Sequence, residues 1–436
     1  MTITFIGHGY VGLVTAAVFA DLGNTVHVIG HTAEKIEKLK KGILPIYEPG
    51  LEEVVKRNVV AKRLLFTLDY DPAIKSSDVV FTAVGTPPKE NGEADLSVVF
   101  DVAEKIGKHL DNYTVIITKS TVPVGTNRKV QEIIEKVKPK NAKFDIASVP
   151  EFLREGQAIG DTLNPDRVVI GVDSEKAKKV LVELHQPIIE RNDSIVFLTN
   201  IETAEMIKYA ANAFLATKIS FANAIAQLSE KVGANGPDVL TAVGLDKRVG
   251  NQFLNAGAGY GGSCFPKDVK ALIAIARGYG YDFSLLEDVE KINEQAMHAI
   301  TEKIENMLDG EVRGKTIGVF GLSFKPDTDD LRDAPSRIII PALLKKGAIV
   351  KAYDPIAMEG AKRLPEFKGL IFSDSPFDAA RGADVLAVIT EWNEFKQLHA
   401  SELKKVMKSP NIVDGRNIYE PEKMKALGFN YIGVGR

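Results

Sequence analysis

Short apolar runs rich in β-branched residues alternate with amphipathic stretches through the first third of the chain. The runs 2–6, 25–29, 79–84, 115–119 and 145–149 predict strands, and residues 11–22 predict a helix that ends at Gly23. Strands that alternate with helices are typical of βαβ units, which build a parallel sheet. The pattern therefore predicts a doubly wound α/β domain over residues 1–198.

Three of these predicted strands are followed at once by turn or capping residues. The segments are Gly85-Thr86-Pro87-Pro88, Ser120-Thr121-Val122-Pro123 and Pro150-Glu151. In open α/β sheets, ligands bind just outside the carboxyl ends of the strands. We therefore expect these three loops to form the floor of a ligand site.

Residues 201–232 contain no Gly or Pro and are rich in Ala, Ile, Leu and Phe, which predicts one helix of about 48 Å. Thr199-x-x-Glu202 resembles a capping box, and Gly233 is a plausible stop. The helix is apolar around most of its circumference, so we expect it to be buried, partly by a second copy of the chain. Residues 199–305 are expected to form a central helical region.

A second α/β pattern begins near Arg313. Strands are predicted at 316–320, 349–353, 385–390 and 411–413, with a helix at 335–346. Residues 306–436 should therefore form a second domain that echoes the first. Gly318-Val319-Phe320-Gly321 lacks a third glycine at the spacing that a dinucleotide turn needs, which argues against a second dinucleotide site.

The first predicted strand runs into Gly7-His8-Gly9-Tyr10-Val11-Gly12, a dinucleotide fingerprint in its proper strand–turn–helix context. The glycines allow the backbone to approach a pyrophosphate at the helix N-terminus. We therefore expect two Rossmann-like doubly wound domains, of which the first binds a nicotinamide dinucleotide. The ribose-binding acid at the end of the second strand is replaced by Gly30. Because His31, Thr32 and Lys35 follow and suit a 2′-phosphate, these residues leave NAD and NADP both open.

Composition narrows the class of protein. The net charge is −3, and 45% of the residues are hydrophobic and 26% charged, so no basic surplus indicates nucleic acid. No apolar run reaches the ~18–20 residues of a membrane span, and no signal sequence is expected. A single cysteine excludes an intrachain disulfide, and no His/Cys cluster has metal-ligand spacing. We expect a cytoplasmic enzyme without a metal.

The single cysteine stands in Gly261-Gly262-Ser263-Cys264-Phe265-Pro266-Lys267-Asp268. Because Pro favours the first helical turn, Cys264 should lie just ahead of a helix N-terminus, which favours the thiolate. Asp268, one turn later, opposes that effect unless lysines offset it, and it can share a pocket with the thiol. A thiol beside a nicotinamide can hold an aldehyde for a second hydride transfer, which takes an alcohol to an acid. The alternative is a buried, inert cysteine.

Other polar residues have a functional and a plain interpretation. Lys208 and Asn212 are four apart on the long apolar helix and can hold water or a developing alkoxide, or Lys208 merely reaches solvent. Glu151 and Glu155 follow a strand end and are one turn apart, so they are candidates for the site. The plain interpretation is that both are solvated carboxylates at a helix start. Cations after strands in the second half can bind phosphates or belong to simple turns: Lys325, Arg332 and Arg416.

Taken together, these runs resemble the UDP-glucose 6-dehydrogenase family over essentially the whole chain. The segments that carry the resemblance are 7–12, 119–123, 150–156, 205–215, 253–268, 324–336 and 414–417, of which those around Cys264 and Lys325 are the most specific. The resemblance implies oxidation of the C6 hydroxyl of UDP-glucose to UDP-glucuronate with two NAD. It also implies a homodimer or larger assembly.

The resemblance also implies roles for individual residues. Cys264 is similar to the nucleophile, and Lys208, Asn212 and Asp268 to the group that positions water and stabilises the intermediates. Thr121 and Glu151 are similar to residues that hold the hydrolytic water. The other implied contacts are Phe152, Leu153, Phe253, Tyr260, Gly261, Lys325 and Arg416 for the sugar nucleotide, Arg248 for that of a neighbouring subunit, and Thr86, Glu155 and Arg332 for the cofactor.

Several alternatives remain open. GDP-mannose dehydrogenases are the runner-up, and UDP-N-acetylhexosamine dehydrogenases are less similar, because their sequence after the cysteine usually differs. A two-electron hydroxyacid dehydrogenase would use the first domain similarly, with Lys208 and Asn212 at its centre and Cys264 as filler. A non-catalytic nucleotide sensor is a third class. Gly30 departs from the family pattern, so NAD is favoured over NADP by the resemblance only.

Overall fold

The computed structural model describes residues 1–192 and 194–436, which form two compact units. The first unit consists of residues 1–211 and 270–279, and the second of residues 212–269 and 280–436. The division falls within two helices, α9 (Ile201–Val232) and α11 (Phe265–Gly278). The predicted architecture, two α/β sheets and a long helix, is confirmed. The division into three domains at 198 and 305 stays a prediction.

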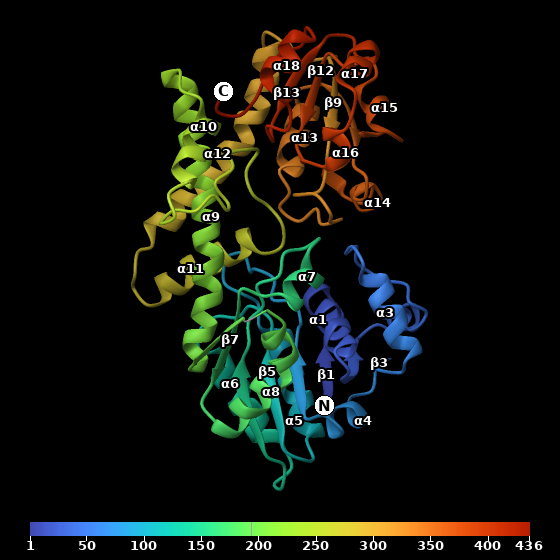
Figure 1. The fold of residues 1–436 in the computed structure, drawn as a ribbon, viewed down its shortest axis with the longest axis vertical. Coiled ribbons are helices and arrows are strands. Elements are labelled where there is room, and N and C mark those ends of the chain that lie inside the picture. The colour runs from blue at the N-terminus through green and yellow to red at the C-terminus, as the bar shows by residue number, and fades with distance from the viewer. Residues whose placement is uncertain (193) are drawn as a thin grey trace. The chain divides into compact units, whose positions relative to one another are not determined.

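The first unit is built on an eight-stranded sheet with the order β3-β2-β1-β4-β5-β6-β7-β8 (Figure 1). The described strands pair in parallel except β6 with β7, so the expectation of a parallel sheet holds with that exception. The predicted strands are confirmed to within two residues at each end. The strands are β1 (Thr2–Ile6), β2 (Thr25–Ile29), β3 (Leu64–Thr67), β4 (Val79–Thr82), β5 (Thr114–Thr118), β6 (Phe144–Ser148), β7 (Arg167–Val172) and β8 (Ile195–Thr199).

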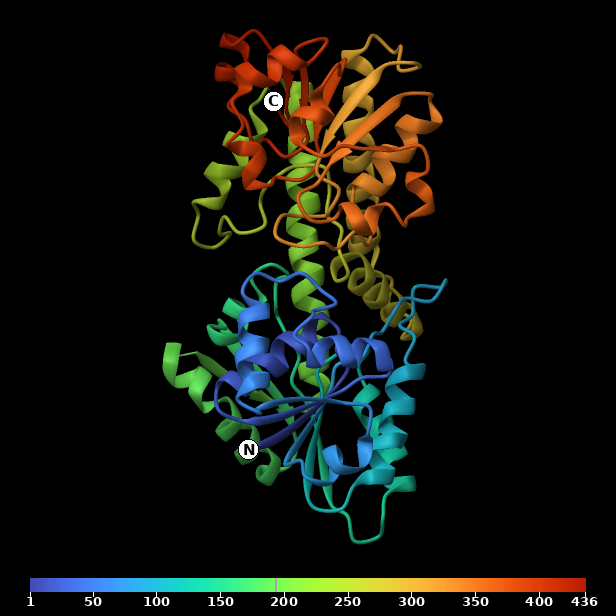
Figure 2. The ribbon, with the colours of Figure 1, turned by 90° about the vertical axis from the view of Figure 1, so that its right-hand side faces the viewer.

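Helices cover both faces of this sheet (Figure 2). Successive strand side chains point to opposite faces, so Val79 and Phe81 join one buried core and Val80 the other. This is why the sheet is doubly wound. The helices are α1 (Tyr10–Asp21), α2 (Ala33–Lys40), α3 (Leu51–Val60), α4 (Tyr70–Lys75), α5 (Ser97–His109), α6 (Thr126–Val137), α7 (Ala158–Leu163) and α8 (Glu175–Asn192).

The second unit holds a six-stranded parallel sheet with the order β11-β10-β9-β12-β13-β14, the arrangement of a dinucleotide-binding fold. Its strands are β9 (Thr316–Phe320), β10 (Ile349–Tyr353), β11 (Ile371–Phe372), β12 (Val385–Val388), β13 (Asn411–Asp414) and β14 (Asn430–Ile432). Its helices are α10 (Gly236–Gly244), α12 (Ser284–Met307), α13 (Ser336–Lys345), α14 (Met358–Ala361), η1 (Pro365–Phe367), α15 (Pro376–Ala380), α16 (Asn393–Lys396), α17 (Ala400–Val406) and α18 (Pro421–Ala426).

The long helix α9 has the predicted bounds, but its N-terminal cap differs from the prediction. Thr199 ends β8, and the Asn200 side-chain oxygen accepts the N–H of Thr203 at 2.8 Å. The expected Thr199–Glu202 capping box is therefore wrong, because asparagine, an equally good cap, stands one residue closer to the helix. Gly233 has φ +76, the left-handed conformation of a helix stop, as predicted.

One stripe of α9 is exposed within this chain. Its large apolar residues at 41–69% exposure are Met206, Phe214, Phe221, Leu228 and Val232. Spacings of seven or eight residues place most of them on one face of the helix. The expectation that α9 is fully buried is therefore not met by the described chain alone. The part of the expectation that assigns burial to a second copy is untested.

Candidate active site

The turn between β1 and α1 has the backbone that its glycines predict. Gly7 has φ +114, and an added Cβ would lie 2.3 Å from the carbonyl oxygen of Ala83. At Gly12 a Cβ would lie 2.2 Å from the carbonyl oxygen of Gly7. At Gly9 a Cβ would meet no heavy atom of the described chain within 4 Å. Gly7 and Gly12 thus make the turn and its packing, while Gly9 leaves room for a pyrophosphate at the N-terminus of α1.

The loops after β4 and β5 come together, as predicted. The Thr86 hydroxyl donates to the carbonyl oxygen of Thr121 at 3.0 Å, and the Ser120 hydroxyl donates to that of Val84 at 2.7 Å. Thr86 is buried and Thr121 is half-buried. These hydrogen bonds hold the two loops together at the carboxyl edge of the sheet, where a ligand is expected.

A buried cluster of three charges lies beside these loops, in the first unit. The Lys208 Nζ, on α9, is 3.0 Å from an Oε of Glu151, and both side chains are almost fully buried at 4% and 6% exposure. The other Oε of Glu151 accepts the N–H of Leu153 at 2.6 Å. Lys119, which directly follows β5, is buried nearby. The interpretations of Lys208 as solvent-reaching and of Glu151 as solvated are therefore wrong.

The pKa values in this cluster are coupled. Burial alone would raise the pKa of Glu151, but the Lys208 charge, the Leu153 N–H and the Lys119 charge outweigh burial and hold it below its usual value. Burial lowers the pKa of Lys119 to about 8; Glu151 acts against this and Lys208 adds to it. Glu151 is thus an ionised carboxylate beside a lysine that can lose its proton near neutral pH. No role was predicted for Lys119 from the sequence, because this lysine falls inside the strand predicted at 115–119, whereas β5 ends at Thr118.

Glu151 and Glu155 do not lie one helical turn apart, contrary to the expectation. Residues 151–157 are irregular, and α7 begins only at Ala158. The Glu48 carboxylate accepts the N–H groups of Gly156 and Ala158 at 2.6 and 2.7 Å, and so takes the position of a cap for α7. Glu155 itself is half-buried.

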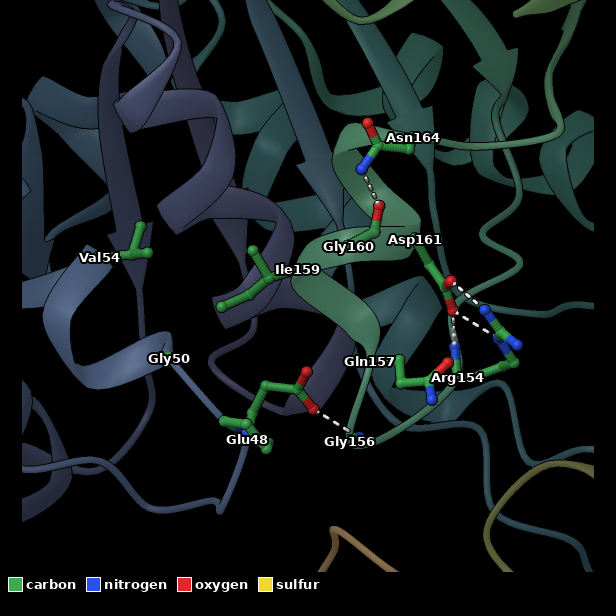
Figure 3. Close-up of a pocket in the computed structure, with 11 residues that line it drawn as sticks. Glu48, Gly50, Val54, Arg154, Gly156, Gln157, Ile159, Gly160, Asp161 and Asn164 are labelled. Carbon is green, nitrogen blue, oxygen red and sulfur yellow. Dashed lines mark hydrogen bonds and ion pairs between the residues drawn. The ribbon is translucent and has the colours of Figure 1, made fainter. Parts of the chain in front are cut away.

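A pocket of about 740 Å³ lies beside this segment (Figure 3). The bond from the N–H of Gly156 to Glu48 and the ion pair of Arg154 with Asp161 are drawn there. None of the residues that we predicted as site residues lines this pocket, and we assign it no function. It is lined by Glu48, Pro49, Gly50, Val54, Arg154, Gly156, Gln157, Ile159, Gly160, Asp161 and Asn164.

Cys264, in the second unit, has the predicted position. It immediately precedes α11, and its carbonyl oxygen accepts the N–H of Asp268 at 2.9 Å, so it is the N-cap residue. The side chain is half-buried, with Sγ 3.5 Å from the hydroxyl of Ser263. The thiol therefore stands at the positive end of a helix dipole and has not been enclosed in a hydrophobic core, as an inert cysteine would be.

Asp268 belongs to a second buried polar group beside Cys264. Its side chain is 1% exposed, it accepts from the Asn212 amide at 2.6 Å, and it forms an ion pair with Lys267. The positive charge of Lys267 thus compensates the negative charge of Asp268, which would otherwise disfavour a thiolate at Cys264. Asn212 lies one turn after Lys208 on α9, so the predicted spacing is realised by the helix.

The cysteine loop packs on the loop after β9, within the second unit. The N–H of Gly262 donates to the carbonyl oxygen of Arg332 at 2.8 Å. A Cβ at Gly261 would lie 2.1 Å from the carbonyl oxygen of Asp333, so only glycine allows this approach. The ring of Phe265, next to the thiol, contacts those of Phe253 and Tyr260 at centroid distances of 6.0 and 5.9 Å.

The predicted phosphate-binding cations have different surroundings. Arg416 donates to the carbonyl oxygens of Gly259, Phe324 and Ile389 at 2.7–3.3 Å, and so joins three loops of the second unit. Lys325 has its Nζ 5.6 Å from the centroid of the Phe324 ring.

Two predicted contacts, Arg332 and Arg248, have exposed side chains. The Arg332 side chain is 62% exposed and forms a bidentate pair with Asp330. It belongs to the second unit, whereas the glycine turn belongs to the first. Arg248 is 89% exposed and pairs with Asp246 of its own turn.

The described residues show neither a metal-binding cluster nor a helix that could span a membrane. They contain no group of three or more His, Cys, Asp and Glu side chains that is able to hold a metal ion. No helix within the described ranges is long and apolar enough to cross a bilayer.

A glycine turn at the carboxyl edge of a doubly wound parallel sheet is typical of a nicotinamide-dependent dehydrogenase, and that is the class of protein this fold defines. Family models make the assignment specific. The chain belongs to the UDP-glucose/GDP-mannose dehydrogenase family: its NAD binding domain matches residues 1–189, its central domain residues 202–295 and its UDP binding domain residues 318–421. NAD is thus the cofactor that the family's first domain binds.

Relatives match along the full length of the chain. UDP-glucose 6-dehydrogenase TuaD of Bacillus subtilis is 49% identical over 100% of this chain and 93% of its own length. UDP-glucose 6-dehydrogenase of Rhizobium meliloti is 48% identical, with both chains fully covered. The solved structure of a UDP-glucose dehydrogenase from the archaeon Pyrobaculum islandicum matches with a TM-score of 0.91 and 36% identity, covering 99% of this chain and 97% of its own.

Proposed function

We propose that this protein oxidises the C6 hydroxyl of UDP-glucose to the carboxylate of UDP-glucuronate and reduces two NAD. The observation that carries the four-electron reaction is the half-buried Cys264 at the start of α11, with the buried Asp268 one turn later. The choice of sugar nucleotide is supported by the full-length likeness to curated UDP-glucose 6-dehydrogenases at 48–49% identity.

Gly7, Gly9 and Gly12 would hold the cofactor, with Tyr10, Val11, Thr86 and Thr121 beside them, and bound NAD supplies the hydride acceptor. In the first step the C6 hydroxyl loses a hydride and a proton and becomes an aldehyde. We propose that Lys208 stabilises the negative charge that develops on the C6 oxygen, because Glu151 holds its ammonium group in place. Lys119, with a pKa of about 8, is a candidate to take up the proton.

In the second half of the reaction the Cys264 thiolate adds to the aldehyde carbon and forms a thiohemiacetal. The alkoxide of this thiohemiacetal would lose a hydride, for which a second bound NAD would supply the acceptor, and become a thioester. Water then attacks the thioester carbonyl and releases the carboxylate, the thiol and one proton. Asn212 and Asp268 are assigned to stabilise the oxygen of these intermediates and to position the water. Glu151 is the candidate base for the water, because it is ionised. The covalent bond keeps the aldehyde in place while the reduced cofactor is exchanged.

The sugar nucleotide is assigned to the second unit. Phe253, Tyr260, Gly261, Lys325 and Arg416 all belong to it, and the family's UDP binding domain matches residues 318–421. We retain the three-part division of the chain at residues 198 and 305, which is supported by the three family models. The thiol must remain reduced, so we assign the enzyme to the cytoplasm.

We also propose that two chains pair through α9. The exposed apolar residues Phe214, Phe221 and Leu228 repeat at seven-residue intervals, the pattern by which one helix packs on another. Arg248, exposed in this chain, is assigned to the sugar nucleotide of the partner. Sedimentation of the protein at several concentrations tests the pairing, and Phe221→Asp should produce monomers.

The decisive experiment counts reduced cofactor per molecule of UDP-glucose consumed. We expect two NADH in the wild-type enzyme, and no steady turnover in Cys264→Ser, because an oxygen ester is a poorer intermediate than a thioester. Ser263→Ala is the matched control, since it removes the neighbouring hydroxyl and keeps the thiol. One NADH per sugar would indicate a two-electron dehydrogenase. Faster oxidation of GDP-mannose or of a UDP-N-acetylhexosamine would reassign the substrate.

A further inference from the structure

The position at which a ribose-binding acid usually stands is closed to one in this protein. Gly30 follows β2, where dinucleotide folds that select NAD carry Asp or Glu. A Cβ at residue 30 would lie 2.5 Å from Cδ1 of Ile36 and 2.7 Å from Cδ2 of His8. An acid therefore does not fit here unless both side chains move. A side chain at residue 30 would require Ile36 and His8 to shift, and with glycine at this position the polar groups of this end of the site come from its neighbours.

His8 lies beside Gly30. The His8 side chain is 6% exposed, and its ring stacks on that of His31 with centroids 5.2 Å apart and planes 14° apart. Its Nε2 has no hydrogen-bond partner among the described residues. Cδ2 is bonded to Nε2, so the ring edge that carries this atom faces the space beside Gly30. A buried, unsatisfied ring nitrogen is uncommon and indicates a polar ligand group at this position.

The surrounding charges are positive. His31 and Lys35 are exposed at the start of α2, and the Thr32 side chain makes no capping hydrogen bond there. Burial, and to a smaller extent the nearby His31 and Lys35, holds the pKa of His8 below its ordinary value, so the neutral ring is favoured. The nearby carboxylates are already engaged: Glu34 with Lys38, Glu37 with Lys40, and Asp69 as the cap of α4.

We propose that this end of the cofactor site accepts a 2′-phosphate, so that the protein binds NADP as well as NAD, with His31, Thr32 and Lys35 as the specificity-determining residues. An acid after the second strand excludes NADP by repulsion, and Gly30 removes that repulsion. His8 Nε2 suits both cofactors, because a neutral imidazole accepts from a ribose hydroxyl in one tautomer and donates to a phosphate oxygen in the other. The proposal rests on the dinucleotide site of the proposed function and not on the identity of the sugar.

The experiment is calorimetric titration of the whole protein, without sugar nucleotide, with NAD and with NADP. A second pair, 5′-AMP and 2′,5′-ADP, differs only by the 2′-phosphate. We expect the Kd for NADP to lie within about tenfold of that for NAD, and 2′,5′-ADP to bind at least as tightly as 5′-AMP. A Kd for NADP more than about tenfold above that for NAD overturns the proposal.

Two exposed positions identify the residues responsible without disturbing the fold. Lys35→Glu and His31→Glu should each weaken NADP about tenfold or more and change NAD less than about twofold, because only NADP carries the extra phosphate. Lys41→Glu makes the same charge change as Lys35→Glu about 9 Å further along, at the residue that follows α2, and is the control. An NADP/NAD ratio that neither variant changes, or that Lys41→Glu changes equally, contradicts the assignment. Because only binding is measured, absence of UDP-glucose oxidation would count against the proposed function and leave this result standing.

Discussion

The two sheets share the strand order third-second-first-fourth but use it differently. In the first unit only residues 7–9 separate β1 from α1, and they form the glycine turn of a dinucleotide site. In the second unit residues 321–335 separate β9 from α13 and form a long loop that contains Lys325 and Arg332 and packs on the cysteine loop. Topology provides the place for a ligand, and the first loop decides which ligand it suits.

The residue that follows the second strand of each sheet is the opposite of what a dinucleotide site in the first sheet alone would predict. In the first unit this residue is Gly30, whereas in the second it is Asp354, the acid that a ribose site would need. Asp354 is 1% exposed, and one of its oxygens accepts the N–H groups of Leu322 and Ser323 at 2.7 and 3.0 Å. The carboxylate thus holds the loop after β9 and is not available to a ribose. This supports the expectation that the second sheet is not a dinucleotide site.

The strongest test of this contrast replaces the glycine after the first strand of each sheet. At Gly321, with φ +94, a Cβ would lie 2.3 Å from Cβ of Thr390, much as a Cβ at Gly7 would meet Ala83. Gly7→Ala and Gly321→Ala should each lower the free energy of unfolding by about 3 kcal/mol or more, measured in urea. Only Gly7→Ala should abolish NAD binding, measured by calorimetry below the unfolding midpoint. Equal loss of NAD affinity in a folded Gly321→Ala protein would refute the division of roles.

Asp354→Ala tests whether the acid of the second sheet is structural. Removing the carboxylate leaves the buried N–H groups of Leu322 and Ser323 and the indole N–H of Trp392 without an acceptor. The free energy of unfolding should fall by about 3–5 kcal/mol. Asp374→Ala, at an exposed aspartate of the same unit, should change it by less than about 0.5 kcal/mol. A stable Asp354→Ala protein would show that the loop is held by other contacts.

Mild acid should weaken the first unit more than the second. Burial lowers the pKa of His185 to about 4, and its ordinary value is 6.5. Between pH 6.5 and 4 the unfolded chain binds more protons at this residue, so its contribution to stability falls by about 3 kcal/mol as the pH falls. His185→Gln should flatten this part of the pH profile of urea unfolding, whereas His298→Gln, at a half-exposed side chain in the second unit, should not. Identical pH profiles in the wild type and His185→Gln would show that His185 does not cause the loss of stability in mild acid.

The smallest expected effect concerns Lys325. If this lysine contacts a phosphate of the sugar nucleotide, Lys325→Ala should weaken UDP about tenfold and leave NAD binding unchanged, because the two ligands use different sheets. Lys345→Ala, at an exposed position on α13, is the control for the loss of one charge. Calorimetry with UDP and with NAD measures both effects. A variant that loses NAD affinity instead would place this loop in the cofactor site.

Helices and strands with a strong local sequence pattern were mostly predicted correctly. The strands at 2–6, 25–29, 316–320 and 349–353 and the helix at 201–232 have their predicted bounds, because their apolar periodicity is long or sharply bounded. Strands β7 and β8 were not predicted, and the antiparallel pairing of β7 with β6 depends on tertiary packing that no local window contains. Glu151 and Glu155 were predicted to lie one helical turn apart, but this segment is irregular, and its Gly156 N–H bonds to Glu48, far away in the sequence.

The sequence by itself determined the chemistry that this chain carries. The glycine spacing at residues 7–12, the thiol before Pro266 and the pair Lys208 and Asn212 are local features, and local geometry makes them meaningful. Only the tertiary structure decided which side chains lie against one another. It pairs Glu151 with Lys208 and Lys267 with Asp268, and it places the His8 ring beside Gly30, where dinucleotide sites usually carry an acid. Burial, and the pairing of charges that burial requires, depend on residues distant along the chain, so no reading of neighbouring positions supplies them.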